Sequence, residues 1–508
     1  MLKLLVPLSL CICSMSWAQK VANPQPFANT ITTEDLKKHL YIVAGKEMEG
    51  RETATPGQRK AAAYIEEYFK SLGLLPASQS NYQMEFPVFQ DSMIKTSLLV
   101  NGKAFSLFKD YTINMSSSHA ETLMAGEVVF VGYGISDSTR DDYKSINTRG
   151  KIVLILPGLP PSQGDQRRTG GQLSIQEAAL KNGAAAILTV QINFPRTPTP
   201  TGGNQYVNGF RKTIYPNTFN ISEQVAREIM GSDYDSVQAS MRTGNPQPKA
   251  YSANLLLELN KEVRNLSSTN VLGYLEGTDK KDEYVILTAH YDHLGKRNDS
   301  TIFYGADDDG SGTVSILELA EAFTKAKQAG KGPRRSIVFM AVSGEEKGLW
   351  GSAWYSEHPV FPLEKTTVNL NIDMIGRIDP KRKQADSMNY VYVVGDHKLS
   401  SDLRPISEAM NKKYTKLGLD YKYNQPNDPE RIYYRSDHYN FARKGVPIIF
   451  YFNGTHNDYH RPTDTPDKIN YDLMKKRAQL VFFTAWEMAN RNEMLKRDIP
   501  LDTAVRGF

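Results

Sequence analysis

Two adjacent glutamates, Glu345 and Glu346, follow an apolar run at residues 337–342 that has the composition of a buried strand. Like charges this close repel each other, and a neighbouring cation relieves that repulsion. Successive residues of an extended chain point to opposite sides. One glutamate of the pair can therefore bind a metal ion, while the other acts on the metal-bound water as general base and then as general acid.

Similar side chains recur where three other apolar segments end and in one loop that leads into a predicted helix. They are His290 and Asp292 in VILTAHYDHLG, Asp307, Asp308 and Asp309 in YGADDDGSG, Asp373 in VNLNIDMIG, and Tyr459 and His460 after VPIIFYFNG. Imidazole and carboxylate ligands without a thiolate suit zinc or a similar divalent ion. Two such ions about 3.5–4 Å apart, sharing a bridging carboxylate, would neutralise the converging acids and form a hydrolytic site.

Each of these residues alone has an ordinary structural explanation, such as a solvent-facing pair or a charged helix start. Their coincidence at several predicted strand ends is what indicates a site. From residue 251 to 495, apolar strand patterns alternate with helical ones, which predicts an α/β fold with a mostly parallel, doubly wound sheet and helices on both faces. Ligands of such sheets bind beyond the carboxyl ends of the strands.

Three further regions precede this domain. Residues 30–118 are predicted to be an N-terminal part of the same domain, with a helix between Thr55-Pro56 and Gly73 and a hairpin turn at Asn101-Gly102. Residues 119–250 change character, with glycine-bounded strands and a Pro/Gly/Thr-rich loop. We interpret them as a smaller α/β module inserted into the main domain.

The first 18 residues have the pattern of a secretory signal peptide, with cleavage after Ala18. The alternative of a lipid anchor at Cys11 or Cys13 is disfavoured by the large residues beside them. Both cysteines of the chain lie in this leader, so the mature protein is expected to have no disulfide and no thiol nucleophile. We expect a secreted or periplasmic protein without a membrane span.

The charge balance excludes one class of partner. The chain of 508 residues has 61 basic and 56 acidic side chains, a net charge of +5, and no basic run. Nucleic-acid binding is therefore not expected.

The motifs AHYDHLG, GADDDGSGT, SGEEKGLWGS, NIDMIG and DYHRPTDTPDKI occur in that order. In this respect the chain resembles the secreted di-zinc aminopeptidases of the bacterial leucyl-aminopeptidase and glutamate-carboxypeptidase type. The segment EMEGRETATPGQRKAAAYIEEYFKSLGL is similar to the N-terminal part of that family, and GKIVLILPG with EAALKNGAAAIL resembles a protease-associated domain. The resemblance implies a zinc exopeptidase fold and two zinc ions per chain.

The resemblance also implies roles for single residues. Asp308 would bridge both zinc ions, with His290 and Asp373 on one ion and Glu346 and His460 on the other. The remaining implied roles are Glu345 as general base, Asp292 as the group that orients the His290 imidazole, and Tyr459 as hydrogen-bond donor to the oxyanion or as a packing residue. His293 and His456 are expected to be non-ligands. Ser436, Asp437 and His438 would shape the substrate pocket or hold a structural loop.

The function expected from these roles is an exported metallo-exopeptidase that removes N-terminal residues from peptide substrates. Two alternatives use the same scaffold: a single-zinc, glutaminyl cyclase-like acyltransferase, and a carboxypeptidase that binds the substrate carboxylate with Arg431 and Arg435. A third is a catalytically silent binding protein. No C-terminal helical dimerisation domain follows the last predicted helix, which favours a monomer. The side-chain preference and the native metal stay open.

Overall fold

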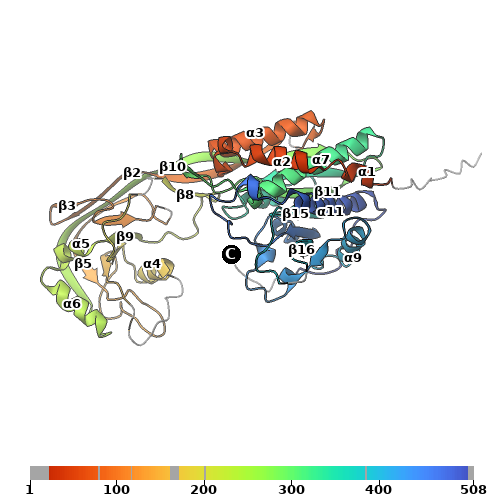
Figure 1. Cartoon of the computed structure of the whole chain (residues 1–508). Coiled ribbons are helices and arrows are strands. Elements are labelled where there is room, and N and C mark those ends of the chain that lie inside the picture. Colours follow the sequence, from red (N-terminus) through yellow and green to blue (C-terminus); the bar gives the residue numbers. More distant parts are fainter. Residues whose placement is uncertain are drawn as a thin grey trace, which may run out of the picture. The chain divides into compact units, whose positions relative to one another are not determined.

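The computed structural model describes residues 22–77, 81–115, 117–158, 160, 171–198, 202–383 and 386–501. The predicted leader lies outside these residues. The chain divides into two compact units, and Figure 1 labels their helices and strands. The first unit contains the described residues up to Phe86 and from Ser268 on, and the second contains Pro87–Ser267.

The sheet of the first unit has the strand order β17-β16-β18-β15-β11-β14-β10. Strands β11, β14, β15 and β18 are parallel to one another, whereas β10 and β16 each pair antiparallel at a side of this group. The predicted mostly parallel sheet is therefore confirmed. The strands are β10 (Lys249–Leu275), β11 (Lys280–His290), β14 (Arg335–Val342), β15 (Thr366–Ile372), β16 (Tyr390–Val394), β17 (Gly418–Asp420) and β18 (Ile448–Phe452), with the short β1 (Leu75–Pro76), β12 (Lys296–Asn298) and β13 (Thr301–Ile302).

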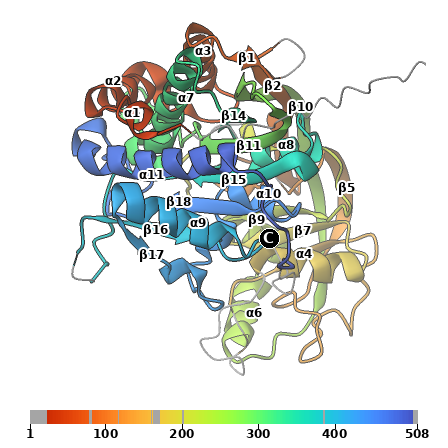
Figure 2. The ribbon, with the colours of Figure 1, turned by 90° about the vertical axis from the view of Figure 1, so that its right-hand side faces the viewer.

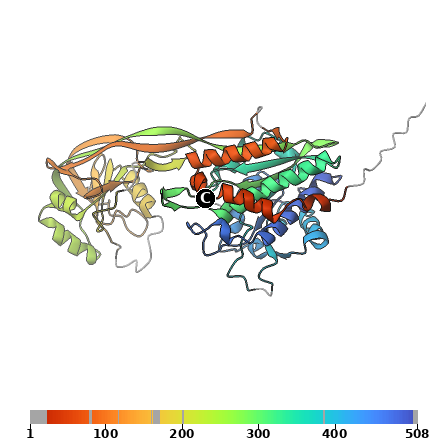
Figure 3. The same cartoon turned by 45° about the horizontal axis from the view of Figure 1, so that its top comes forward.

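Helices cover both faces of this sheet, which is why its central strands β14 and β15 are buried at every position. Successive residues of one strand face opposite layers, as Val338 and Phe339 do in β14. One layer holds α2, α3, α7 and α11, and α2 and α3 lie alongside α7 (Figure 3). The helices are α1 (Gln25–Ala28), α2 (Thr33–Val43), α3 (Pro56–Ser71), α7 (Gly312–Gln328), α8 (Trp350–Glu357), α9 (Leu403–Met410), α10 (His438–Ala442) and α11 (Tyr471–Asn490).

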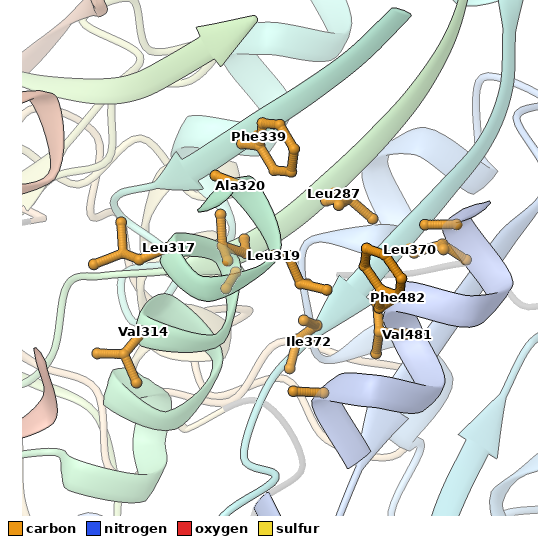
Figure 4. Close-up of a cluster of buried hydrophobic side chains, with 14 of the residues drawn as sticks. Leu287, Val314, Leu317, Leu319, Ala320, Phe339, Leu370, Ile372, Val481 and Phe482 are labelled. Atoms are coloured by element: carbon orange, nitrogen blue, oxygen red, sulfur yellow. The ribbon is translucent and has the colours of Figure 1, made fainter. Parts of the chain in front are cut away.

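The core between α7, α11 and the sheet fixes the strands that lead into the site. Figure 4 shows Leu317 of α7 and Phe482 of α11 in the same cluster as Phe339, Leu287 and Leu370 of three neighbouring strands. Each such side chain stabilises the fold by about 1.5–3 kcal/mol when fully buried. The carboxyl ends of β11, β14 and β15 are thereby held in register.

Local sequence signals account for most helix ends. Helix α3 begins with Pro56 after Thr55, and Gly73 follows its end with φ of 73°, as predicted. A short 3-10 turn, Pro466–Lys468, precedes the last helix. Helix α11 begins at Tyr471, where Asn470 accepts a hydrogen bond from the backbone N–H of Leu473.

Helix α7 carries a buried acid outside the predicted site. Glu318 is 1% exposed, and its Oε1 lies 3.6 Å from Nε2 of His39 on α2. Burial lowers the pKa of His39, so this imidazole is neutral. Burial raises the pKa of Glu318 to about 8, and the acids Glu321 and Asp35 act in the same direction.

We expect Glu318→Gln to stabilise the protein at pH 9 by about 1–3 kcal/mol more than at pH 5. Between the ordinary carboxyl pKa and about 8, the folded chain keeps a proton on Glu318 that the unfolded chain has lost. Stability of the wild type therefore falls as the pH rises through this window, and the uncharged amide removes that loss. Urea unfolding at both pH values measures the difference, and equal effects at pH 5 and pH 9 would contradict the assignment.

The second unit has its own hydrophobic core. In the strand order, the part of β10 in this unit is followed by β5, β6, β7, β9 and β4. The predicted hairpin at Asn101-Gly102 joins β2 to β3. The strands are β2 (Gln83–Val100), β3 (Lys103–Phe105), β4 (Tyr111–Ile113), β5 (Glu121–Phe130), β6 (Ile152–Ile155), β7 (Ala186–Val190), β8 (Gly202–Tyr206) and β9 (Asn217–Ile221), and the helices are α4 (Gly171–Lys181), α5 (Glu223–Met230) and α6 (Asp233–Arg242).

This unit extends beyond the predicted insert of residues 119–250 at both ends, because the long strands β2 and β10 each supply residues to both units. The strands of both units are visible in Figure 2. That residues 119–250 form a protease-associated domain stays a prediction. Among the described residues, no helix is long and apolar enough to cross a membrane.

Candidate metal centre

The five side chains predicted as metal ligands meet at one edge of the sheet of the first unit. They are His290 at the end of β11, Asp308 in the turn Ala306–Ser311 before α7, Glu346 after β14, Asp373 directly after β15 and His460 after β18. Because these four strands are parallel, their carboxyl ends lie at the same edge. The topology alone therefore brings together residues that are far apart in the sequence.

Asp308 lies between two groups of donor atoms. Its Oδ1 is 3.3 Å from Nε2 of His290, and that nitrogen is 3.7 Å from Oδ1 of Asp373. Its Oδ2 is 3.2 Å from Nε2 of His460, and that nitrogen is 3.1 Å from Oε2 of Glu346. Each oxygen of one carboxylate thus faces a different pair of ligands, as a carboxylate that bridges two ions must do.

The chemistry of the donor set fits divalent cations. His290 Nε2, Asp308 Oδ2 and Glu346 Oε1 are buried atoms without a hydrogen-bond partner, although buried polar groups are ordinarily satisfied. Donor atoms of His290, Asp308 and Asp373 lie within 4.8 Å of one another, which suits a common cation. Nitrogen and carboxylate oxygen ligands without sulfur are the set that zinc accepts.

His293 belongs to the second group in space, although it was expected to lie outside the ligand set. Its Nδ1 is 2.8 Å from Oε1 of Glu346 and 3.9 Å from Oδ2 of Asp308. The imidazole is fully buried. The sequence signal was its place in AHYDHLG, three residues after His290, but sequence spacing alone does not show which way a loop side chain turns.

The aspartates on either side of Asp308 hold the backbone that carries it. Asp309 Oδ1 accepts the N–H groups of Gly312 and Met374, at 2.8 and 3.0 Å. Asp307 Oδ1 accepts the N–H of Gly376 at 2.7 Å. The run of three acids therefore ties the turn before α7 to the loop that follows Asp373.

Two more residues support this turn. Asp464 accepts the backbone N–H groups of Asp307 and Asp308 at 3.0 and 3.2 Å. His456 Nδ1 accepts the N–H of Asp458, and its Nε2 lies 3.2 Å from Oδ2 of Asp307. His456 thus contacts Asp307, the residue directly before Asp308.

Asp292 links a ligand to the predicted general base. Its Oδ1 accepts the backbone N–H of Glu345 at 3.2 Å and lies 3.7 Å from Nδ1 of His290. The shorter contact of that imidazole, 3.1 Å, is with the backbone carbonyl oxygen of Asp292. The hydrogen bond that orients His290 was expected at the carboxylate, and the tight turn after β11 places the carbonyl oxygen there instead.

Glu345 lies where it can act on a water bound between the ligands. Its Oε2 is 3.9 Å from Nε2 of His290, and it lines a pocket together with Asp308 and Asp373. Burial raises the pKa of Glu345 well above its usual range; His290 opposes this shift, and the Asp373 carboxylate adds to it. A carboxyl that holds a proton more tightly suits both taking a proton and returning it.

The pocket has a volume of about 370 Å³, part of it open to solvent. Its apolar lining consists of Met374, Ile432, Phe450 and Phe452, all buried. Phe450 and Phe452 are alternate residues of β18 and therefore point to the same side. This wall is shaped for an apolar group beside the carboxylates.

Tyr459 and Arg435 line the polar side of this pocket. Arg435 donates a hydrogen bond to the hydroxyl oxygen of Tyr459 at 3.1 Å, so the phenol hydrogen points to another acceptor. Burial raises the pKa of Tyr459, and Asp308 acts in the same direction, so Tyr459 stays a donor. Its ring stacks on that of His460 at 3.8 Å.

Other candidates lie behind the pocket or away from it. Ser436 Oγ accepts a hydrogen bond from Asn371, and His438 Nε2 donates to the carbonyl oxygen of Tyr433. Both are buried, as is Asp437, and none of the three is among the described lining residues. These contacts support a structural loop. Arg431 is exposed and does not line the pocket either.

Comparison with known proteins agrees with this geometry. Residues 270–485 match the family model of Peptidase family M28. A probable leucine aminopeptidase of Arthroderma otae is 31% identical over 219 residues, which are 42% of this chain and 56% of that protein. A vacuolar membrane protease of Phaeosphaeria nodorum is 24% identical over 266 residues, 47% of this chain and 26% of that protein. The chain thus spans about half the length, or less, of these two relatives.

The fold has a solved counterpart. A zinc aminopeptidase from Bacillus subtilis superposes with a TM-score of 0.52 and 19% sequence identity, covering 93% of this chain and 98% of the other. At this identity the likeness shows a shared fold.

Proposed function

We infer from the peptidase family M28 domain at residues 270–485 that the protein is a zinc aminopeptidase, a hydrolase that releases N-terminal residues from peptides. One observation carries this proposal: the two oxygens of Asp308 face two separate pairs of ligands. We propose two zinc ions per chain, one held by His290, Asp308 and Asp373 and the other by Asp308, Glu346 and His460. Bound zinc supplies Lewis acidity, which polarises a peptide carbonyl and acidifies a water.

Glu345 is the residue that moves the proton. In the proposed reaction its carboxylate takes a proton from the attacking water and then gives it to the leaving amine nitrogen, so the peptide C–N bond breaks and a neutral amine departs. Asp292 supports this role by accepting the backbone N–H of Glu345. Tyr459 would donate its phenol hydrogen to the oxyanion that develops on the former carbonyl oxygen.

The pocket supports both the polarity and the substrate class. Of the three carboxylates that line it, Glu345 is the one that the proposed zinc ions do not use, and its negative charge would attract the ammonium group of a free N-terminus. A carboxypeptidase would bind the substrate carboxylate with a cationic side chain. Apart from His460, Arg435 is the cationic side chain among the described lining residues, and one of its N–H groups donates to Tyr459. The carboxypeptidase alternative rests on this side chain. The wall of Phe450 and Phe452 favours an apolar N-terminal side chain.

We expect the purified protein to cleave leucyl and phenylalanyl amides, but not the same substrates with a blocked N-terminus. A strong chelator should abolish the activity, and added zinc should restore it, because the ions carry the Lewis acidity. Fluorogenic substrates in free and N-acetylated forms measure this directly. Cleavage of the blocked forms alone would overturn the aminopeptidase polarity, and chelator-resistant activity would overturn the zinc assignment.

A further inference from the structure

Four consecutive residues that lie far upstream of residues 270–485 in the sequence contact loops that carry the proposed metal ligands. They are Gly50-Arg51-Glu52-Thr53, here called the 50–53 segment. The N–H groups of His293 and Gly295 donate to the carbonyl oxygens of Arg51 and Gly50, at 3.3 and 2.9 Å. Glu52 also pairs with Lys347, at 2.7 Å, beside the two glutamates. The segment thus reaches two of the loops that carry predicted ligands.

Arg51 connects the loop after β11 to the start of the turn that carries Asp308. Its guanidinium is completely buried and donates to four carbonyl oxygens. They belong to Tyr291 at 2.6 Å, Val43 and Tyr304 at 2.8 Å, and Gly305 at 2.9 Å. Tyr291 separates His290 from Asp292, and Gly305 begins the turn of the three aspartates. Burial lowers the pKa of Arg51 to about 10, so it stays charged near these acids at neutral pH.

Thr53 makes the contact closest to the proposed chemistry. It is fully buried, and its Oγ1–H donates to Oδ2 of Asp292 at 2.8 Å. The other oxygen of Asp292 accepts the N–H of Glu345 and faces His290. The hydroxyl therefore fixes the rotation of a carboxylate whose second oxygen touches both a ligand and the general base.

We propose that the 50–53 segment is a positioning element of the metal centre and that Thr53 is the positioning residue that acts through Asp292 on His290 and Glu345. The inference rests on the proposed function. Removing the hydroxyl lets the Asp292 carboxylate rotate, which loosens the imidazole and the backbone of the base together. Such outer partners of metal ligands typically change metal affinity or activity about 10–100-fold.

Thr53→Val tests this, since valine has nearly the same shape and lacks the donor. We expect kcat on a leucyl amide to fall about tenfold with KM within about twofold, and the zinc dissociation constant to rise about tenfold. Zinc affinity is measured by competition with a chromophoric chelator, which requires no substrate. Thr53→Ser keeps the donor and should restore both values to within about twofold of the wild type.

Thr484→Val is the matched control. Thr484 of α11 is equally buried, and its Oγ1 donates a hydrogen bond to the carbonyl oxygen of Leu480 at 3.0 Å. The substitution therefore removes a buried hydrogen bond that is remote from the proposed ligands. We expect wild-type zinc affinity and kcat in this variant. If Thr53→Val matches Thr484→Val in both readouts, or if Thr53→Ser is as impaired as Thr53→Val, the positioning role is wrong. If the wild-type protein binds zinc but cleaves no peptide, the proposed function is wrong. The zinc affinities of the Thr53 variants would still test the positioning role in that case.

Discussion

Glu345→Gln is expected to lower kcat/KM by about 10³-fold while the protein keeps its zinc. Glutamine has the shape of glutamate and fits the same buried place beside His290, but its amide accepts no proton from the attacking water. The side chain holds no ion in the proposed site, so binding of the metal should survive. Steady-state kinetics on a leucyl amide, with zinc measured by mass spectrometry on the same sample, give both quantities.

Two variants sharpen this test. Glu346→Gln alters the neighbouring carboxylate, whose Oε2 lies 3.1 Å from His460, and should reduce zinc content as well as activity. Tyr459→Phe removes only the phenol donor and should cost about 10²-fold in kcat. If Glu345→Gln instead loses zinc and Glu346→Gln keeps both zinc and activity, the two glutamates have the opposite roles.

Asp308→Asn should remove both ions at once. Among the described residues, this carboxylate is the side chain that faces both pairs of ligands, at 3.3 Å from His290 and 3.2 Å from His460. An amide supplies one neutral oxygen in place of two charged ones, so one site loses its shared ligand and the other keeps only a neutral one. We expect less than about one zinc ion per chain after dialysis and loss of nearly all hydrolysis.

Asp373→Asn is the control for that result, because this carboxylate lies 3.7 Å from His290, a ligand of the first proposed ion. It should leave about one ion per chain, held by the second pair. Isothermal titration with zinc separates one site from two. Equal zinc loss in Asp308→Asn and Asp373→Asn would contradict the bridging role.

The sequence patterns predict at which edge of the sheet the site lies. Apolar runs mark β11, β14, β15 and β18, and a parallel sheet brings their carboxyl ends together whatever separates them in the chain. His290 and Asp373 end or directly follow two of these strands, so their positions needed no knowledge of loops. The core residues of the same strands could be predicted as well, since buried parallel strands have nearly continuous apolar runs.

The contacts that support the ligands were not predictable in this way. Thr53 reaches Asp292 across 239 positions of sequence, and nothing in the polar segment around it indicates a buried hydroxyl. His293 turns inward from a loop whose direction is set by Arg51 and Gly50, both far upstream. The long strands β2 and β10 likewise run through the boundary between units, because a strand pattern does not show where its partner changes.

The order in which the donors occur along the chain has a consequence for biosynthesis. His460 is the last of the five to leave the ribosome, after most of the 508 residues have been made, and none of the five comes from the second unit. In the proposed site, the full set of five ligands therefore exists only after His460 has been synthesised and β18, the strand before it, has joined the sheet.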